Sequence, residues 1–252
     1  MSPETGKIIE TGAAALLFAA TFLAGGRVHP FRTLIHDQRN IVSFGAGMSA
    51  AYVFVHLMPE LHGVHRVVVE SASMPLRYEG MAIYFLALLG FLVFYGLDHL
   101  RRQMREGVEE GQAGASFRLH VGGFAAYVCL MAYLLVNSLE TTPVSIMLYA
   151  AAIGFHFLAV DRELRREHGA AYDRIGRFVL AGMSVLGWGV GLLLALPAPV
   201  LAMLVAFVSG AIIMNSLIME LPSEKDGRFP AFMTGGIAYG VILLPLAANT
   251  NS

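Results

Sequence analysis

The stretch Ile175–Leu196 reads IGRFVLAGMSVLGWGVGLLLAL and contains one charged residue, Arg177. After the short connection Pro197–Pro199 comes a second apolar block, Val200–Glu220. Blocks of about 20 apolar residues have the length that a helix needs to cross the hydrocarbon core of a bilayer. The short connection predicts that these two helices form an antiparallel hairpin.

The whole chain has the composition of a membrane protein. Hydrophobic residues make up 56% of the 252 residues and charged residues only 14%, whereas a soluble domain carries roughly 25% charge. The apolar runs predict eight spans: 8–25, 41–60, 79–98, 119–139, 144–160, 175–196, 200–220 and 231–248. A β-barrel would need alternating segments of about ten residues, so we predict an all-α, eight-helix transmembrane bundle that forms a single domain over residues 1–252.

The basic residues predict how the chain is oriented. All 17 lysines and arginines except Lys7, Arg66 and Arg77 lie in the odd-numbered connections between spans or, in the case of Arg177, at the edge of the fifth one. Connections rich in basic residues stay in the cytoplasm, which predicts a multi-pass inner-membrane protein with both termini outside. The first block has its arginines after it rather than before it, so we interpret it as a retained span and not as a secretory signal.

The end of the second span carries candidate metal ligands. His56 and Glu60 are four residues apart and share one face of a helix, and Pro59 leaves the carbonyl of Val55 without its usual amide donor. Nitrogen and oxygen ligands of this kind suit zinc. The alternative is a helix end at the membrane surface, where polar residues are tolerated.

Two further spans contain polar residues at depth. His156 lies in the fifth span, and Asp161 follows five residues later, about 140° around a regular helix. Asn215 and Glu220 lie toward the end of the seventh span. Ionisable residues inside spans usually have a functional reason, although a hydrogen-bonded core histidine remains an equal interpretation of His156.

Other polar and small residues receive structural interpretations. His120 is expected at a membrane interface, and residues 161–177 are expected to form a solvated helical extension at the membrane surface. The glycine pairs Gly187/Gly191 and Gly236/Gly240 have the spacing that lets membrane helices approach closely. The single cysteine, Cys129, excludes an intrachain disulfide and a thiolate zinc cluster.

The segment His56-Leu57-Met58-Pro59-Glu60 resembles the His-Leu-Leu-Pro-Glu end of the second span in the ZIP zinc and iron transporters. Residues 210–224, with Glu220, are similar to the seventh span of that family, and His156 falls where its fifth span carries a His-x-x-Pro-Glu motif. The resemblance implies a ZIP-like fold of eight spans with both termini outside. It also implies that a divalent cation (zinc, iron or manganese) is carried as substrate toward the cytoplasm.

The chain departs from that family in two places. The fourth span lacks the family's His-Asn-x-Pro-Asp/Glu motif, and Ala159-Val160 stands where the fifth span should have Pro-Glu. The resemblance therefore implies a divergent or degenerate member. Any metal site would be reduced and built from His156 with help from Glu220, Asn215 or Asp161, while His56 and Glu60 match only the entry region.

Three functions remain open from the sequence. The first is a transporter of divalent metal cations, and the second is a ZIP-fold membrane protein that binds or senses metal or a partner without transport. The third is an intramembrane enzyme or carrier whose pocket Tyr127, Cys129 and Tyr133 would line. It is disfavoured because Tyr127, Cys129, Met131 and Tyr133 follow one another at a spacing of two, so they do not share one helix face. We therefore predict no enzymatic activity, partners limited to the bilayer and a metal ion, and no nucleic acid, and we leave a homodimer open.

Overall fold

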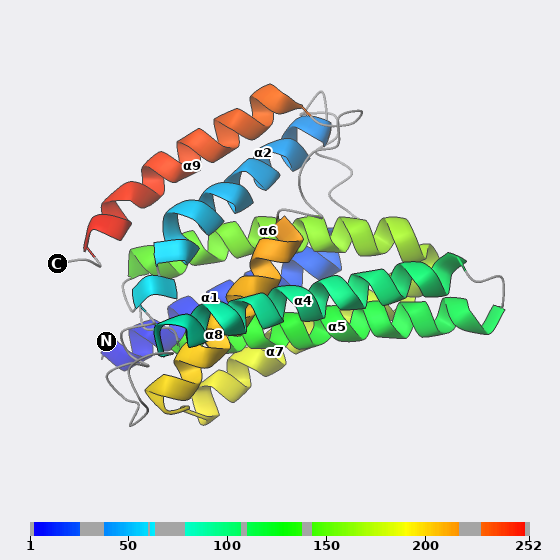
Figure 1. The fold of residues 1–252 in the computed structure, drawn as a ribbon, viewed down its shortest axis with the longest axis horizontal. Helices are drawn as coiled ribbons and strands as arrows, with labels where there is room; N and C mark the ends of the chain where they lie inside the picture. Colours follow the sequence, from blue (N-terminus) through cyan, green and yellow to red (C-terminus); the bar gives the residue numbers. More distant parts are fainter. Residues whose placement is uncertain are drawn as a thin grey trace. The chain divides into compact units, whose positions relative to one another are not determined.

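The computed structural model describes residues 3–25, 38–59, 61–63, 79–106, 110–137, 143–216 and 228–249, and these are helical almost throughout (Figure 1). The helices are α1 (Pro3–Ala24), α2 (Gln38–Ala51), α4 (Glu79–Glu106), α5 (Glu110–Asn137), α6 (Pro143–Ala171), α7 (Arg177–Leu193), α8 (Ala198–Met214) and α9 (Phe229–Asn249). Two π-helical turns, η3 (Tyr52–Leu57) and η4 (Tyr172–Gly176), follow α2 and α6 directly. The all-α prediction is confirmed for the described residues, whereas the eight-span count and the ZIP-like arrangement stay predictions.

Within the described residues, four helical stretches are long and apolar enough to cross a membrane: Thr5–Ala24, Met81–Met104, Gly114–Asn137 and the bent run Ile146–Leu193. Two shorter apolar helices, Ala198–Met214 and Phe229–Leu244, accompany them. Large apolar side chains are exposed on these helices, including Leu16, Phe85 and Val241. A surface of this kind is expected where lipid rather than water covers the protein.

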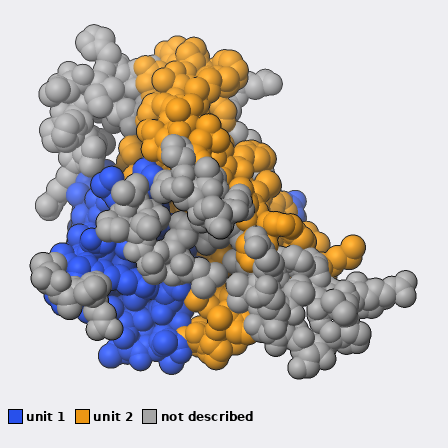
Figure 2. Space-filling view, turned by 90° about the vertical axis from the view of Figure 1, so that its left-hand side faces the viewer, with its two compact units in different colours: residues 1–26, 92–150, 160–195 blue, residues 27–91, 151–159, 196–252 orange. Residues whose placement is uncertain are grey.

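The helices group into two compact units, coloured separately in Figure 2. Unit 1 consists of residues 1–26, 92–150 and 160–195, and unit 2 of residues 27–91, 151–159 and 196–252. The prediction of a single transmembrane domain stays a prediction.

In unit 1, α7 packs against both α5 and α1. A Cβ atom built on Gly187 would collide with the backbone carbonyl of Cys129 in α5, and one on Gly191 would lie 2.9 Å from Cβ of Val136. The predicted packing role of this glycine pair is therefore confirmed. At the end of α7, the amide of Asn137 donates to the Gly191 carbonyl at 2.9 Å.

The contact between α7 and α1 centres on the only tryptophan of the chain. The indole nitrogen of Trp188 donates a hydrogen bond to Oγ1 of Thr11 at 3.2 Å. Gly12 leaves room for the ring, since a Cβ atom there would lie 3.2 Å from it. Trp188 is thus a natural fluorescence probe of the packing in unit 1.

In unit 2, α2 and α9 lie side by side (Figure 1). Their backbones meet at glycines, because a Cβ atom on Gly47 would collide with the carbonyl of Phe232 and one on Gly235 with the carbonyl of Phe44. Gly236 also approaches Gly47, whereas Gly240 has ordinary contacts only. Close approach of this kind is how small residues stabilise helix pairs in lipid, where apolar burial provides little driving force.

Candidate metal centre

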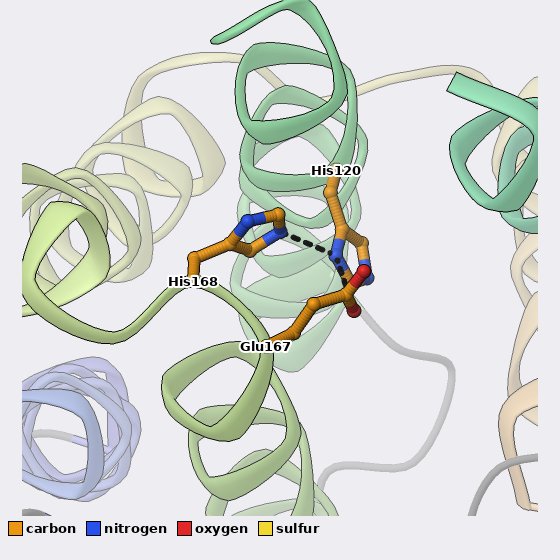
Figure 3. A group of neighbouring side chains, drawn as sticks. All are labelled: His120, Glu167 and His168. Atoms are coloured by element: carbon orange, nitrogen blue, oxygen red, sulfur yellow. Dashed lines mark hydrogen bonds and ion pairs between the residues drawn. The ribbon is translucent and has the colours of Figure 1, made fainter. Parts of the chain in front are cut away.

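Three side chains with metal-binding atoms converge in unit 1 (Figure 3). His120 comes from α5, and Glu167 and His168 come from α6. Nδ1 of His120 lies 3.0 Å from Nε2 of His168 and 3.4 Å from Oε2 of Glu167. One ligand atom from each residue lies within 4.8 Å of the other two.

A bend in α6 follows directly after these two adjacent ligands. Neighbouring residues on a regular helix project about 100° apart, yet both Glu167 and His168 reach His120 in Figure 3. Gly169 has φ 47° and ψ −120°, so the regular helix is interrupted there. A positive φ is accessible to glycine at little cost, so a glycine suits the position at which α6 bends.

Aromatic rings pack against both imidazoles. The ring of Phe117 lies 5.3 Å from that of His168, in an edge-on arrangement. The ring of Phe124 lies 5.2 Å from that of His120. His120 is buried, so its ring has a restricted environment in which its orientation is set by neighbours rather than by solvent.

A buried arginine from α4 completes the surroundings. Arg101 forms an ion pair with Oε2 of Glu167 through Nη1 and with Asp98 through Nη2 and Nε. The side chains of Arg101 and Glu167 are only 5% and 3% exposed. Burying a charge is costly unless it is paired, and each of these two groups has an opposite charge as its partner.

Two of the distances between the donor atoms are compatible with a metal coordination shell. Zinc bound at about 2.0–2.1 Å in a tetrahedral site has ligand atoms roughly 3.3 Å apart, close to the 3.0 and 3.4 Å measured around Nδ1 of His120. Two imidazoles and a carboxylate are a common ligand set for zinc. The 3.0 Å contact is also a hydrogen bond between imidazoles, and a metal would take the place of its shared proton.

The predicted ligands Asp161 and His56 have other partners. Asp161 is buried in unit 1, where its carboxylate accepts a hydrogen bond from the Tyr172 hydroxyl at 2.6 Å and ion-pairs with Arg165 at 3.1 Å. His56 lies in η3, with its ring 5.1 Å from that of Tyr52. Their assignment as metal ligands stays a prediction.

His156 and Asn215 both belong to unit 2 and are each 2% exposed. The ring of His156 lies 5.8 Å from that of Phe157. Nδ2 of Asn215 has no hydrogen-bond partner among the described residues. Glu60 and Glu220 lie outside the described residues, so their predicted roles stay predictions as well.

Sequence reasoning missed the cluster of His120, Glu167 and His168. It placed His120 at an interface and Glu167 on a solvated extension, because it searched for ligands inside the apolar blocks. A usable signal was present, since the third and fifth connections were both predicted to be cytoplasmic and His120 and the pair Glu167-His168 lie near those connections.

Comparisons with protein-family models, with curated proteins and with solved structures gave no match to this chain.

Proposed function

We propose that this chain is a multi-pass protein of the inner membrane that binds a divalent metal cation, with zinc preferred, at His120, Glu167 and His168. The single observation that carries the proposal is the convergence of two imidazoles and one carboxylate, with one ligand atom of each within 4.8 Å of the other two. The distribution of basic residues predicts that this end of α5 and α6 lies on the cytoplasmic side. The protein would then bind cytoplasmic metal.

Binding or sensing, rather than transport, is the role that these residues favour. The side chain of Glu167 is only 3% exposed and His120 is buried, and a buried site suits retention of an ion better than its passage. The sequence also lacks the family's metal motif in the fourth span. The metal preference follows from the donors, since imidazole nitrogen and carboxylate oxygen suit zinc better than harder cations such as Mg²⁺.

Transport of the same cation toward the cytoplasm is the second candidate. The buried polar residues His156 and Asn215 favour it, because polar groups inside membrane helices are costly and often mark ion pathways. Zinc, iron and manganese uptake by proteoliposomes tests it. Uptake above that of empty liposomes, abolished by His156→Ala, would support transport, and its absence with folded protein would exclude it.

Zinc titration of the purified protein in detergent, followed by calorimetry, tests the binding site. We expect one zinc per chain, and a loss of affinity of at least about tenfold in both His120→Ala and His168→Ala, because each removes a nitrogen donor. X-ray absorption of the zinc complex is expected to report nitrogen and oxygen neighbours without sulfur.

His99→Ala provides the matched control for this titration. His99 is exposed on α4 and hydrogen-bonded to Gln103 at 3.1 Å, outside the group of three, and its loss should leave zinc affinity unchanged. Equal zinc binding by the wild type, His120→Ala and His168→Ala would place the metal elsewhere and contradict the proposal.

A further inference from the structure

We propose that Arg101 is a built-in competitor of the metal: the ion pair between Arg101 and Glu167 and the binding of a divalent cation exclude each other. Metal binding would then release α4 from α6 within unit 1. This inference rests on the proposed metal site. In it, Arg101 controls the affinity for the metal, and the Arg101–Glu167 ion pair is a switch that opens when the metal binds.

The competition follows from one oxygen atom. Oε2 of Glu167 accepts from Nη1 of Arg101, and the same oxygen is the one that lies 3.4 Å from Nδ1 of His120. A cation bound between this oxygen and His120 would lie next to the guanidinium. Two positive centres in a buried environment repel each other strongly, since few water molecules screen them.

Arg101 has a second partner, Asp98, with which it can remain paired. Its Nε and Nη2 already donate to Oδ1 of Asp98, one turn earlier on α4. If the metal takes Glu167 from Arg101, the guanidinium therefore stays paired with Asp98. Metal binding then leaves no isolated buried charge on Arg101. The carboxylate of Asp98 is in turn fixed by Arg102, whose Nε lies 2.8 Å from Oδ2.

The charge balance sets the direction of the effect. The three buried groups Asp98, Glu167 and Arg101 carry one positive charge against two negative ones. A divalent cation would make this group net positive, whereas without Arg101 it would make the group neutral. Removing the arginine charge should therefore strengthen metal binding, although it removes a structural ion pair.

The exchange would also change how α4 is held. The Arg101–Glu167 ion pair joins α4 to α6, and the backbone carbonyl of Arg101 accepts from Oγ of Ser116 in α5 at 3.4 Å. Breaking the first of these contacts leaves this end of α4 with one fewer contact to the other helices of unit 1. The helix end is then expected to open more often.

Zinc titration of Arg101→Met tests the competition. We expect zinc affinity to rise at least about tenfold over wild type, because the repelling charge is gone. Arg101→Lys keeps the charge and should bind zinc more weakly than Arg101→Met. Arg102→Met is the matched control, since Arg102 pairs with the same Asp98 but is 59% exposed, and its affinity should stay within about twofold of wild type.

A second measurement uses the wild type alone and does not depend on the folding of a variant. Backbone hydrogen exchange in residues 92–106 should be faster in the zinc-saturated protein than in the zinc-free protein. Unchanged exchange, or an Arg101→Met affinity equal to or below that of wild type, would overturn the switch while leaving the metal site intact. Absence of zinc binding in both wild type and Arg101→Met would overturn the metal site and the switch together.

Discussion

Gly187→Leu is expected to separate α7 from α5 and to lower the free energy of unfolding by about 3 kcal/mol or more. A side chain at this position would collide with the carbonyl of Cys129, which is backbone and cannot move aside by changing a rotamer. The two helices must therefore shift apart, and the contacts around Gly191 would be lost with them.

Thermal unfolding in detergent, followed by Trp188 fluorescence, measures this loss, since Trp188 is the residue next to Gly187 and its indole bonds to Thr11. The matched control is Gly189→Leu in the same helix, where a Cβ atom meets nothing within 4 Å. The control should unfold at nearly the wild-type temperature. Equal destabilisation by the two variants would show that leucine destabilises α7 at either glycine. The close contact of Gly187 with α5 would then not be the cause.

Apolar block length predicted the helices well but not their ends. The predicted span 175–196 corresponds to α7 at Arg177–Leu193, whereas the predicted span 79–98 continues as α4 to Glu106. The extension of α4 contains the ion pairs of Asp98 with Arg101 and Arg102. Pairs at this spacing support a helix beyond its apolar block, and hydropathy alone does not register them.

Local backbone chemistry was partly predictable. Pro59 removes the amide that a regular helix would bond to the carbonyl of Val55, and the π-helical turn Tyr52–Leu57 contains that residue. The positive φ of Gly169 had no comparable signal, because many glycines in this chain sit in regular helices. The proline therefore indicated where the helix after α2 is weakened, whereas nothing in the sequence indicated that α6 bends at Gly169.

The candidate metal centre could not be predicted because it depends on tertiary packing. His120 and Glu167 are distant in sequence, and their side chains, from α5 and α6, meet only in the folded unit 1. A search limited to helix faces finds ligands four residues apart, such as His56 and Glu60. It cannot find ligands that two separate helices bring together.

Asp161→Ala is expected to destabilise unit 1 by about 2–4 kcal/mol, because it removes a buried acceptor that two other groups share. The Asp161 carboxylate is buried, and it accepts the hydroxyl of the fully buried Tyr172 while pairing with Arg165. Alanine would leave that hydroxyl without its partner inside the protein. Asp161→Asn keeps an acceptor for Tyr172 and should recover part of the loss.

Asp173→Ala is the matched control for this prediction, because Arg165 pairs with both aspartates but Asp173 is 47% exposed. Exposed ion pairs contribute about 0–1 kcal/mol, so chemical unfolding followed by Trp188 fluorescence should separate the two variants clearly. Zinc affinity should be the same in both, since Asp161 lies outside the group formed by His120, Glu167 and His168. Loss of zinc binding in Asp161→Ala, at a temperature where the variant is folded, would instead return Asp161 to the role of metal ligand that the sequence predicted.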